Sequence, residues 1–282
     1  MTWRYSRTMK LIKSYQIRGV PGEVLRFDFS GRTVELWAPQ EPSEHLLVAH
    51  DGQNVFDGKS STFRGKTWEM AQSAFKVGYE TGNVPPIIIA IWHSSTKQDP
   101  MGRAKDLSPQ RFFQEDVKVN LSSVLDSDLD LLHGDKYLEE IFTNYVPSLL
   151  SLLNLQITPE NTALIGSSMG GLSTLYAAYL RPKDFKTALA LSPHWVIGSE
   201  ALVNRTVKEL PAPGTHKVWM SRGTKGLDAE YEPFQDLADE LMLIKGYQKD
   251  FDFASKVFKK TGHNESSWAS YLDYPLRFWL NN

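Results

Sequence analysis

The sequence predicts an α/β protein with a mostly parallel central sheet, antiparallel strands at its N-terminal end and helices on both faces. Strand-forming residues recur in three stretches of the first forty positions, and Ser30-Gly31 supplies a tight turn between two of the strands. After them, apolar runs of strand length alternate with segments of helical period, which is typical of βαβ units. A chain of 282 residues also has the size of one undivided domain of this class.

The strands follow from these apolar runs. The first group, expected to be antiparallel, covers residues 14–17, 24–29 and 32–37. The second group, expected to be parallel, covers residues 45–50, 87–92, 162–165, 187–191, 217–220 and 251–258.

Helices are indicated by apolar spacing. One stripe at i, i+3, i+4, i+7 and i+8 consists of Leu172, Leu175, Tyr176, Tyr179 and Leu180. Pro182 should end that helix. A second helix is expected over 234–241, before a left-handed cap at Gly246, and a last one over 267–280.

We expect a single domain over residues 1–282, because no linker or internal repeat divides the chain. The segment 94–135 is rich in Asp, Lys, Gln and Ser, and we interpret it as a lid or an active-site insertion. Its acidic residues Asp126, Asp128 and Asp130 do not complete a calcium loop, because Leu131 stands where that loop needs glycine. We therefore expect no metal site.

Composition excludes several classes of function. The net charge of −2 offers no basic surface for nucleic acid, and no apolar run approaches the ~20 residues that cross a membrane. The N-terminal residues lack the apolar core of a signal peptide, and the absence of cysteine excludes thiol catalysis and disulfides. We expect a cytoplasmic protein that acts without a cofactor on a small molecule.

The strongest motif is Gly166-Ser-Ser-Met-Gly170, which matches G-x-S-x-G. This motif forms a sharp turn between a strand and a helix and lifts its central serine, here Ser168, above the sheet. The strand at 162–165 runs into the motif and the 172–180 helix leaves it, as such a turn requires. The spacing predicts a nucleophile elbow with Ser168 as the nucleophile.

Two backbone amides are candidates for an oxyanion hole. The amide of Met169 follows the nucleophile and begins a helix, where the helix dipole favours negative charge. A second donor should come from the loop after an earlier strand, and the turn after the 45–50 strand points to Gln53.

A serine nucleophile needs a histidine base and a carboxylate that orients it. In a fold of this kind the order is serine, acid, histidine, and His263 stands between the last strand and the last helix. Asp228 is the preferred acid, with Glu232 as the alternative. Residues expected to line the substrate pocket are His50, His194 and Trp195.

These stretches resemble the putative-esterase family of α/β-hydrolases, which includes enterochelin esterases, S-formylglutathione hydrolases, feruloyl esterases and mycolyltransferases. The resemblance spans most of the chain and rests on residues 50–57, 103–109, 166–171, 223–224 and 262–265. It implies an α/β-hydrolase fold, catalytic roles for Ser168 and His263, and an oxyanion amide at Gln53. Relatives often place the acid closer to the Gly223-Thr224 pair than Asp228 stands, which keeps Glu232 open.

The expected function is therefore carboxylic ester hydrolysis through an acyl-enzyme on Ser168. An acyltransferase would use the same catalytic triad with an alcohol in place of water. A non-catalytic binding protein on the same fold would be expected to lose the nucleophile, the base or the oxyanion turn, and none of these is missing.

Overall fold

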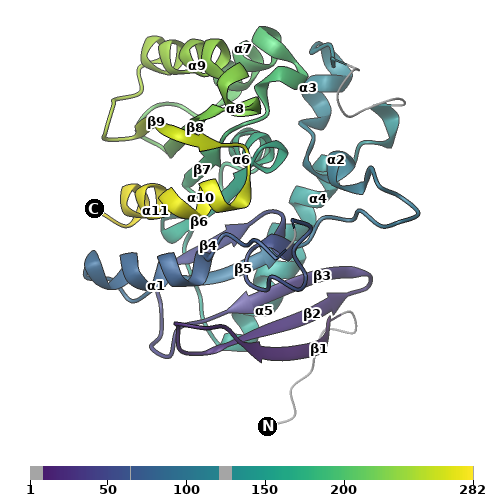
Figure 1. Ribbon diagram of the computed structural model, residues 1–282, viewed down its shortest axis with the longest axis vertical. Coiled ribbons are helices and arrows are strands. Elements are labelled where there is room, and N and C mark those ends of the chain that lie inside the picture. The colour runs from purple at the N-terminus through teal and green to yellow at the C-terminus, as the bar shows by residue number, and fades with distance from the viewer. Residues whose placement is uncertain (1–8, 64, 121–128, 282) are drawn as a thin grey trace.

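The computed structural model describes residues 9–63, 65–120 and 129–281. Its strands form one sheet in the order β1-β2-β3-β5-β4-β6-β7-β8-β9, which Figure 1 shows from the purple strand β1 to the yellow strand β9. The strands span β1 (Met9–Gln16), β2 (Glu23–Phe29), β3 (Arg32–Trp37), β4 (Leu46–Ala49), β5 (Ile87–Ile91), β6 (Thr162–Ser167), β7 (Thr187–Leu191), β8 (Lys217–Lys225) and β9 (Phe253–Gly262).

The pairing confirms the mixed sheet that the sequence predicts. Strands β1, β2, β3 and β5 pair antiparallel, and all pairs from β5 through β4 to β9 are parallel. The carboxyl ends of β4, β6, β7, β8 and β9 therefore lie along one edge of the sheet, which is where α/β proteins place their ligands.

Helices cover both faces of the sheet (Figure 1). They span α1 (Met70–Glu80), α2 (Gly102–Leu107), α3 (Gln110–Glu115), α4 (Gly134–Glu140), α5 (Val146–Leu153), α6 (Met169–Leu180), α7 (Ser199–Glu209), α8 (Leu227–Glu230), α9 (Glu232–Lys245), α10 (Glu265–Tyr271) and α11 (Asp273–Leu280). Shorter helical turns are η1 (Gly52–Asn54), η2 (Leu129–Leu131), the π-helical η3 (Ile141–Tyr145), η4 (Pro159–Asn161) and η5 (Trp195–Ile197).

The two faces of the sheet carry separate hydrophobic cores because side chains alternate along a strand. On β4, Leu46 and Val48 pack into the core beneath α4 to α7 and α9. Leu47 and Ala49 point the other way, into the core beneath α1, α10 and α11. Burial on both faces explains why the parallel strands are continuous apolar runs.

Helix α6 differs from the expected amphipathic helix. Every residue from Met169 to Ala178 is buried, because α6 lies against β6 and β7 and is covered by α2, α4 and α7. The helix ends at Leu180, two residues before Pro182, as the sequence predicts.

The C-terminal helix expected over 267–280 is two helices. Helix α10 begins at Glu265 after Asn264, whose side chain accepts a hydrogen bond from the Ser267 amide, and it ends at Tyr271. Pro275 explains the break, because its ring clashes with the carbonyl four residues earlier in a continuous helix. Helix α11 starts anew at Asp273.

The described part of the 94–135 segment contains α2, α3 and η2. Leu107, Phe112 and Phe113 are buried in the core, so this part is packed against the rest of the molecule. Residues 121–128, including Asp126 and Asp128, lie outside the described residues. The lid function of the segment stays a prediction.

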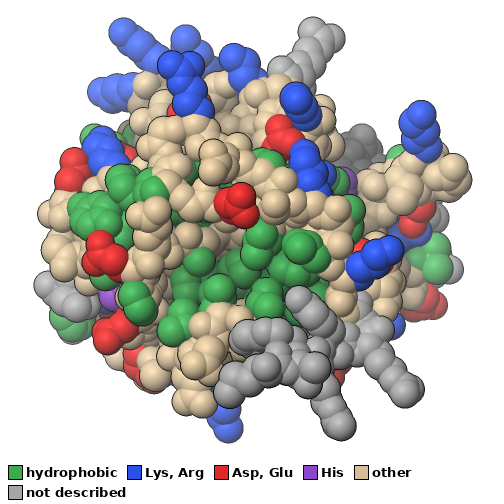
Figure 2. Space-filling model, turned by 90° about the horizontal axis from the view of Figure 1, so that it is seen from below, with side chains coloured by type: hydrophobic (Ala, Val, Ile, Leu, Met, Phe, Trp, Pro, Cys, Tyr) green, Lys and Arg blue, Asp and Glu red, His purple; other side chains and the backbone are tan. Residues whose placement is uncertain are grey.

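Strand β1 forms one edge of the sheet, and its Leu11 and Ile12 are about half exposed. Figure 2 shows the molecule from below, with hydrophobic side chains gathered on part of the surface and charged side chains around them. Lys10 and Lys13 flank the two apolar residues on β1, and charge at an edge strand opposes pairing with another chain.

Candidate active site

Ser168 stands in a strained turn between β6 and α6. Its backbone has φ 56° and ψ −121°, and α6 begins at the next residue, Met169. A Cβ atom on Gly166 would lie 2.4 Å from the backbone of Gly170, so only glycine allows the strand and the helix to approach so closely. The local structure is the strand–turn–helix that the G-x-S-x-G motif predicts.

His263 and Asp228 meet at the same edge of the sheet. His263 follows β9 directly, and its Nδ1 lies 2.6 Å from Oδ1 of Asp228, which is completely buried at the start of α8. The other oxygen, Oδ2, accepts hydrogen bonds from the Gly223 amide at 2.7 Å and the Ser192 hydroxyl at 2.9 Å. The carboxylate is thus fixed on both sides, with one oxygen facing the imidazole.

Glu232, the alternative acid, lies elsewhere. Its Oε1 is 2.5 Å from Nη2 of Arg222, and its side chain is 63% exposed. It is the first residue of α9, where acidic residues complement the helix dipole. The contact with His263 favours Asp228.

The two candidate oxyanion amides begin short helical stretches. Gln53 lies in η1 directly after β4, and Met169 is the first residue of α6. Neither amide donates a hydrogen bond to any residue within 9–63, 65–120 and 129–281. Both donors therefore remain free for an acceptor such as a substrate oxygen.

The turn that carries Gln53 packs against strand β5 and is joined to helix α2 by an ion pair. A Cβ atom on Gly52 would lie 2.7 Å from the backbone of Ala90, so the turn sits directly on β5. Asp51 binds Arg103 of α2 through two hydrogen bonds of 2.7 Å. Burial pushes the pKa of Asp51 upward, but the Arg103 guanidinium outweighs burial and leaves this pKa below its ordinary value.

His50 and His194 are both buried near these residues. Nδ1 of His50 lies 2.8 Å from the Tyr137 hydroxyl, and its Nε2 has no partner among the described residues. Nδ1 of His194 lies 2.5 Å from the Tyr231 hydroxyl. Burial lowers the pKa of each histidine to about 4, so both rings are neutral at pH 7.

Trp195 does not line a pocket, contrary to the expectation from the sequence. It is 0% exposed, and its indole N–H donates a hydrogen bond to Gln235 at 3.1 Å inside the core. The short helix η5 turns the chain after β7, so the indole points under α9 instead of toward Ser168.

A family model described as "Putative esterase" matches residues 35–277. The chain belongs to the putative esterase family. The resemblance noted from the sequence is therefore confirmed. Esterases are carboxylic ester hydrolases, so this is the class of enzyme to which the chain belongs. No curated protein matches the sequence.

Solved structures share the fold of this putative esterase. The enterobactin esterase FES from Shigella flexneri, with 2,3-di-hydroxy-N-benzoyl-serine, has a TM-score of 0.64 at 17% identity and covers 94% of this chain. The chain spans 60% of the FES chain. The BES protein from Bacillus cereus has a TM-score of 0.63 at 14% identity, with 99% of this chain and 97% of that chain covered.

A third structure is the enterobactin hydrolase IroE in complex with DFP, with a TM-score of 0.59 at 18% identity. The comparison covers 97% of this chain and 96% of that chain. At such identities the likeness shows the fold alone, which is of the α/β-hydrolase type.

Two neighbours of the putative esterase's candidate site, Trp268 and Glu265, were given no role by the sequence analysis. The ring of Trp268 lies perpendicular to that of His263, with centroids 5.0 Å apart, and its N–H donates to the Ser192 hydroxyl at 3.1 Å. Glu265 is buried and accepts a hydrogen bond from Asn54 at 3.4 Å. Burial raises the pKa of Glu265 to about 7.

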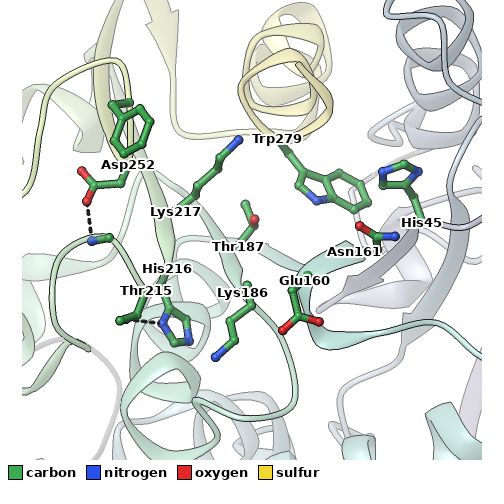
Figure 3. A pocket seen from close by; sticks show the side chains of 12 residues that line it. His45, Glu160, Asn161, Lys186, Thr187, Thr215, His216, Lys217, Asp252 and Trp279 are labelled. Atoms are coloured by element: carbon green, nitrogen blue, oxygen red, sulfur yellow. Dashed lines mark hydrogen bonds between the residues drawn. The ribbon is translucent and has the colours of Figure 1, made fainter. Parts of the chain in front are cut away.

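A separate cavity of about 300 Å³ lies at the opposite edge of the sheet, near the amino ends of β7 and β8. Figure 3 shows that Lys186, Lys217 and Trp279 are among its lining side chains. Lys186 already donates to the Pro182 carbonyl at 2.9 Å, and Asp252 accepts from the Gly214 amide at 2.7 Å. We assign no ligand to this cavity.

Within the described residues, no cluster of His, Asp and Glu side chains has the arrangement of a metal site. Likewise, none of the helices in that part of the chain is long and apolar enough to span a bilayer.

Proposed function

We propose that the chain is a serine carboxylic-ester hydrolase in which Ser168 is the nucleophile, His263 the base and Asp228 the acid that orients the base. The observation that carries this proposal is the 2.6 Å contact between His263 and Asp228 at the sheet edge where the Ser168 turn emerges. Neutral His263 with its proton on Nδ1, toward Asp228, offers Nε2 to the serine hydroxyl.

The reaction follows from this arrangement. Ser168 Oγ bonds to the ester carbonyl carbon while His263 Nε2 takes its proton, and the carbonyl oxygen becomes an oxyanion. The free amides of Gln53 and Met169 are suited to stabilise that charge. The intermediate then reforms the carbonyl, the bond to the alcohol oxygen breaks, and His263 returns the proton to the departing alcohol.

Water completes the cycle. It attacks the acyl-enzyme as His263 removes one of its protons, and collapse of the second intermediate releases the carboxylic acid and restores the Ser168 hydroxyl. The carboxylate of Asp228 stabilises the imidazolium in both steps. Hydrogen bonds from the Gly223 amide and the Ser192 hydroxyl hold this carboxylate in one orientation.

We further propose that the described part of the 94–135 segment borders the substrate. The support is the ion pair between Arg103 of α2 and Asp51. A Cβ atom added to Gly170 would lie 3.3 Å from Oδ2 of Asp51, so this carboxylate lies close to the start of α6. Arg103 Nη2 also lies 3.5 Å from the Ser167 carbonyl, so the pair lies beside residues before and after Ser168.

An ester panel tests the proposed function. It should contain short-chain p-nitrophenyl esters, feruloyl esters and enterobactin, in the presence of which the structure of one neighbour, an enterobactin esterase, was determined. Ser168→Ala should abolish turnover, whereas Ser167→Ala, which removes the neighbouring hydroxyl, should retain it. Product analysis with added alcohols separates hydrolysis from acyl transfer. Equal activity of wild type and Ser168→Ala would overturn the proposal.

A further inference from the structure

Tyr231 lies beside the reacting groups, although neither the sequence motif nor the triad includes it. It is completely buried at the start of α9, three residues after Asp228. Its ring is perpendicular to that of His263, with centroids 5.5 Å apart. Its hydroxyl lies 2.5 Å from Nδ1 of His194, whose backbone amide donates a hydrogen bond to the Ser168 carbonyl at 3.2 Å.

The strand order fixes the side of Ser168 on which Tyr231 lies. Ser168 follows β6, and Gln53 follows β4, the neighbour of β6 on one side. His194 follows β7 and Tyr231 follows β8, on the other side of β6. The phenol therefore lies on the His263 side, away from the Gln53 amide and its oxyanion position.

The direction of the hydrogen bonds follows from the needs of Ser168. In the proposed mechanism its hydroxyl proton points to Nε2 of His263, so the side of its oxygen that faces Tyr231 needs a donor and not an acceptor. The phenol oxygen then accepts from Nδ1 of His194, which lies 2.5 Å away. The ring of His194 is neutral at pH 7 because burial lowers its pKa to about 4, so Nε2 carries no proton in this tautomer.

We propose that Tyr231 is a further catalytic residue whose hydroxyl donates a hydrogen bond to the alcohol oxygen that leaves during acylation, and that His194 is the residue that positions it. This inference rests on the proposed function of Ser168 and His263. As the bond between carbon and alcohol oxygen breaks, its electron pair passes to that oxygen. His263 Nε2 delivers the proton, and Tyr231 keeps its own proton while its hydrogen bond stabilises the developing charge.

The burial of Tyr231 supports a donor role. Desolvation, together with the negative charge of Asp228, raises the pKa of the phenol well above its ordinary value. The phenol therefore stays protonated across the working range of an esterase. A buried donor aimed at a developing charge acts more strongly than one in water.

Leaving-group dependence tests this role. For a series of acetate esters, kcat/KM reports acylation, and its logarithm is plotted against the pKa of the leaving alcohol. Tyr231→Phe should lower kcat/KM by ~100-fold for ethyl acetate, the scale of removing one donor at a developing charge. For p-nitrophenyl acetate the loss should stay below ~10-fold, because that leaving group needs little stabilisation.

Tyr247→Phe is the matched control. Tyr247 is also a buried tyrosine, but its hydroxyl bonds to the Pro211 carbonyl beyond the end of α9. It should retain the wild-type slope. If Tyr231→Phe fails to fold, His194→Leu and His194→Asn replace it in the test. His194→Leu should steepen the dependence of kcat/KM on the pKa of the leaving alcohol. His194→Asn keeps a donor near the position of Nδ1, so its slope should lie closer to that of the wild type.

The outcomes separate this inference from the proposed function. Absence of ester turnover in the wild type would overturn the proposed function. Turnover in the wild type, with an equal loss on ethyl and p-nitrophenyl acetate in Tyr231→Phe, would overturn the role of Tyr231 and leave the triad standing.

Discussion

Arg103 of α2 and Asp51 of the turn after β4 form a two-point ion pair, with both hydrogen bonds at 2.7 Å. The pair joins a segment with little sequence pattern to the turn that carries Gln53. Asp51 is almost fully buried, whereas about a third of the Arg103 side chain is exposed.

Removing the arginine should therefore leave a buried charge without its partner. Arg103→Gln is expected to lower the free energy of unfolding by up to ~3–5 kcal/mol, less where water reaches the site, and to lower kcat through displacement of Gln53. Lys105→Gln is the control, because Lys105, on the same helix as Arg103, pairs with the exposed Asp99 before that helix; its loss should cost under ~1 kcal/mol. Urea unfolding compares the two, and equal losses would contradict the structural role of the pair.

Asp228 and Glu232 are distinguished by amide substitutions. Asp228→Asn keeps the shape but presents an amide to His263, so kcat should fall by up to ~10⁴. Glu232→Gln should change kcat little, because Glu232 faces Arg222 at the surface. Steady-state kinetics with one p-nitrophenyl ester measures both. A collapse in Glu232→Gln together with an active Asp228→Asn would reverse the assignment.

Glu265 makes stability depend on pH. Burial raises the pKa of its carboxyl from 4.5 to about 7 in the folded protein. Between these values the folded state binds more protons than the unfolded state, so the contribution of Glu265 to stability falls as pH rises. The loss by pH 8 should be on the order of 3 kcal/mol.

The measurement is the free energy of unfolding of wild type and Glu265→Gln from pH 4.5 to 8. Their difference removes the opposite effect of His50 and His194, which are buried neutral and favour folding at higher pH. The wild type should lose stability relative to Glu265→Gln as pH rises. A difference that does not vary with pH would contradict the burial account.

Trp195→Ala should lower the free energy of unfolding without changing the substrate specificity. The indole fills the core and bonds to Gln235, so its removal should cost ~3–5 kcal/mol. The folded fraction should keep the wild-type ranking of bulky and small esters. A changed ranking with unchanged stability would return Trp195 to the substrate pocket.

The sequence predicted those parts of the site that depend on local structure. The Ser168 turn needs only a strand, two glycines and a helix in succession, and all of these are visible in one stretch of the chain. The strand order, in contrast, brings Asp228 and Ser192 together from different loops. Sequence spacing therefore could not decide between Asp228 and Glu232.

The direction in which a side chain points was harder to predict from the sequence than the place of its residue in the fold. Trp195 does follow β7 at the expected edge, but the positive φ of Ser192 and the turn of η5 direct its indole into the core. Tyr231 and Trp268 reach His263 only through tertiary packing, and each reads as an ordinary core aromatic in the sequence. The break before Pro275 was missed because the apolar period continues through it.

Covalent trapping of the nucleophile tests the central claim most directly. The wild-type protein is incubated with a fluorophosphonate, digested and analysed by mass spectrometry, with Ser168→Ala and Ser167→Ala treated alike. We predict one adduct, on Ser168, in the wild type and in Ser167→Ala, with loss of ester turnover in proportion to labelling. Labelling at another residue, or turnover retained in Ser168→Ala, would contradict the account.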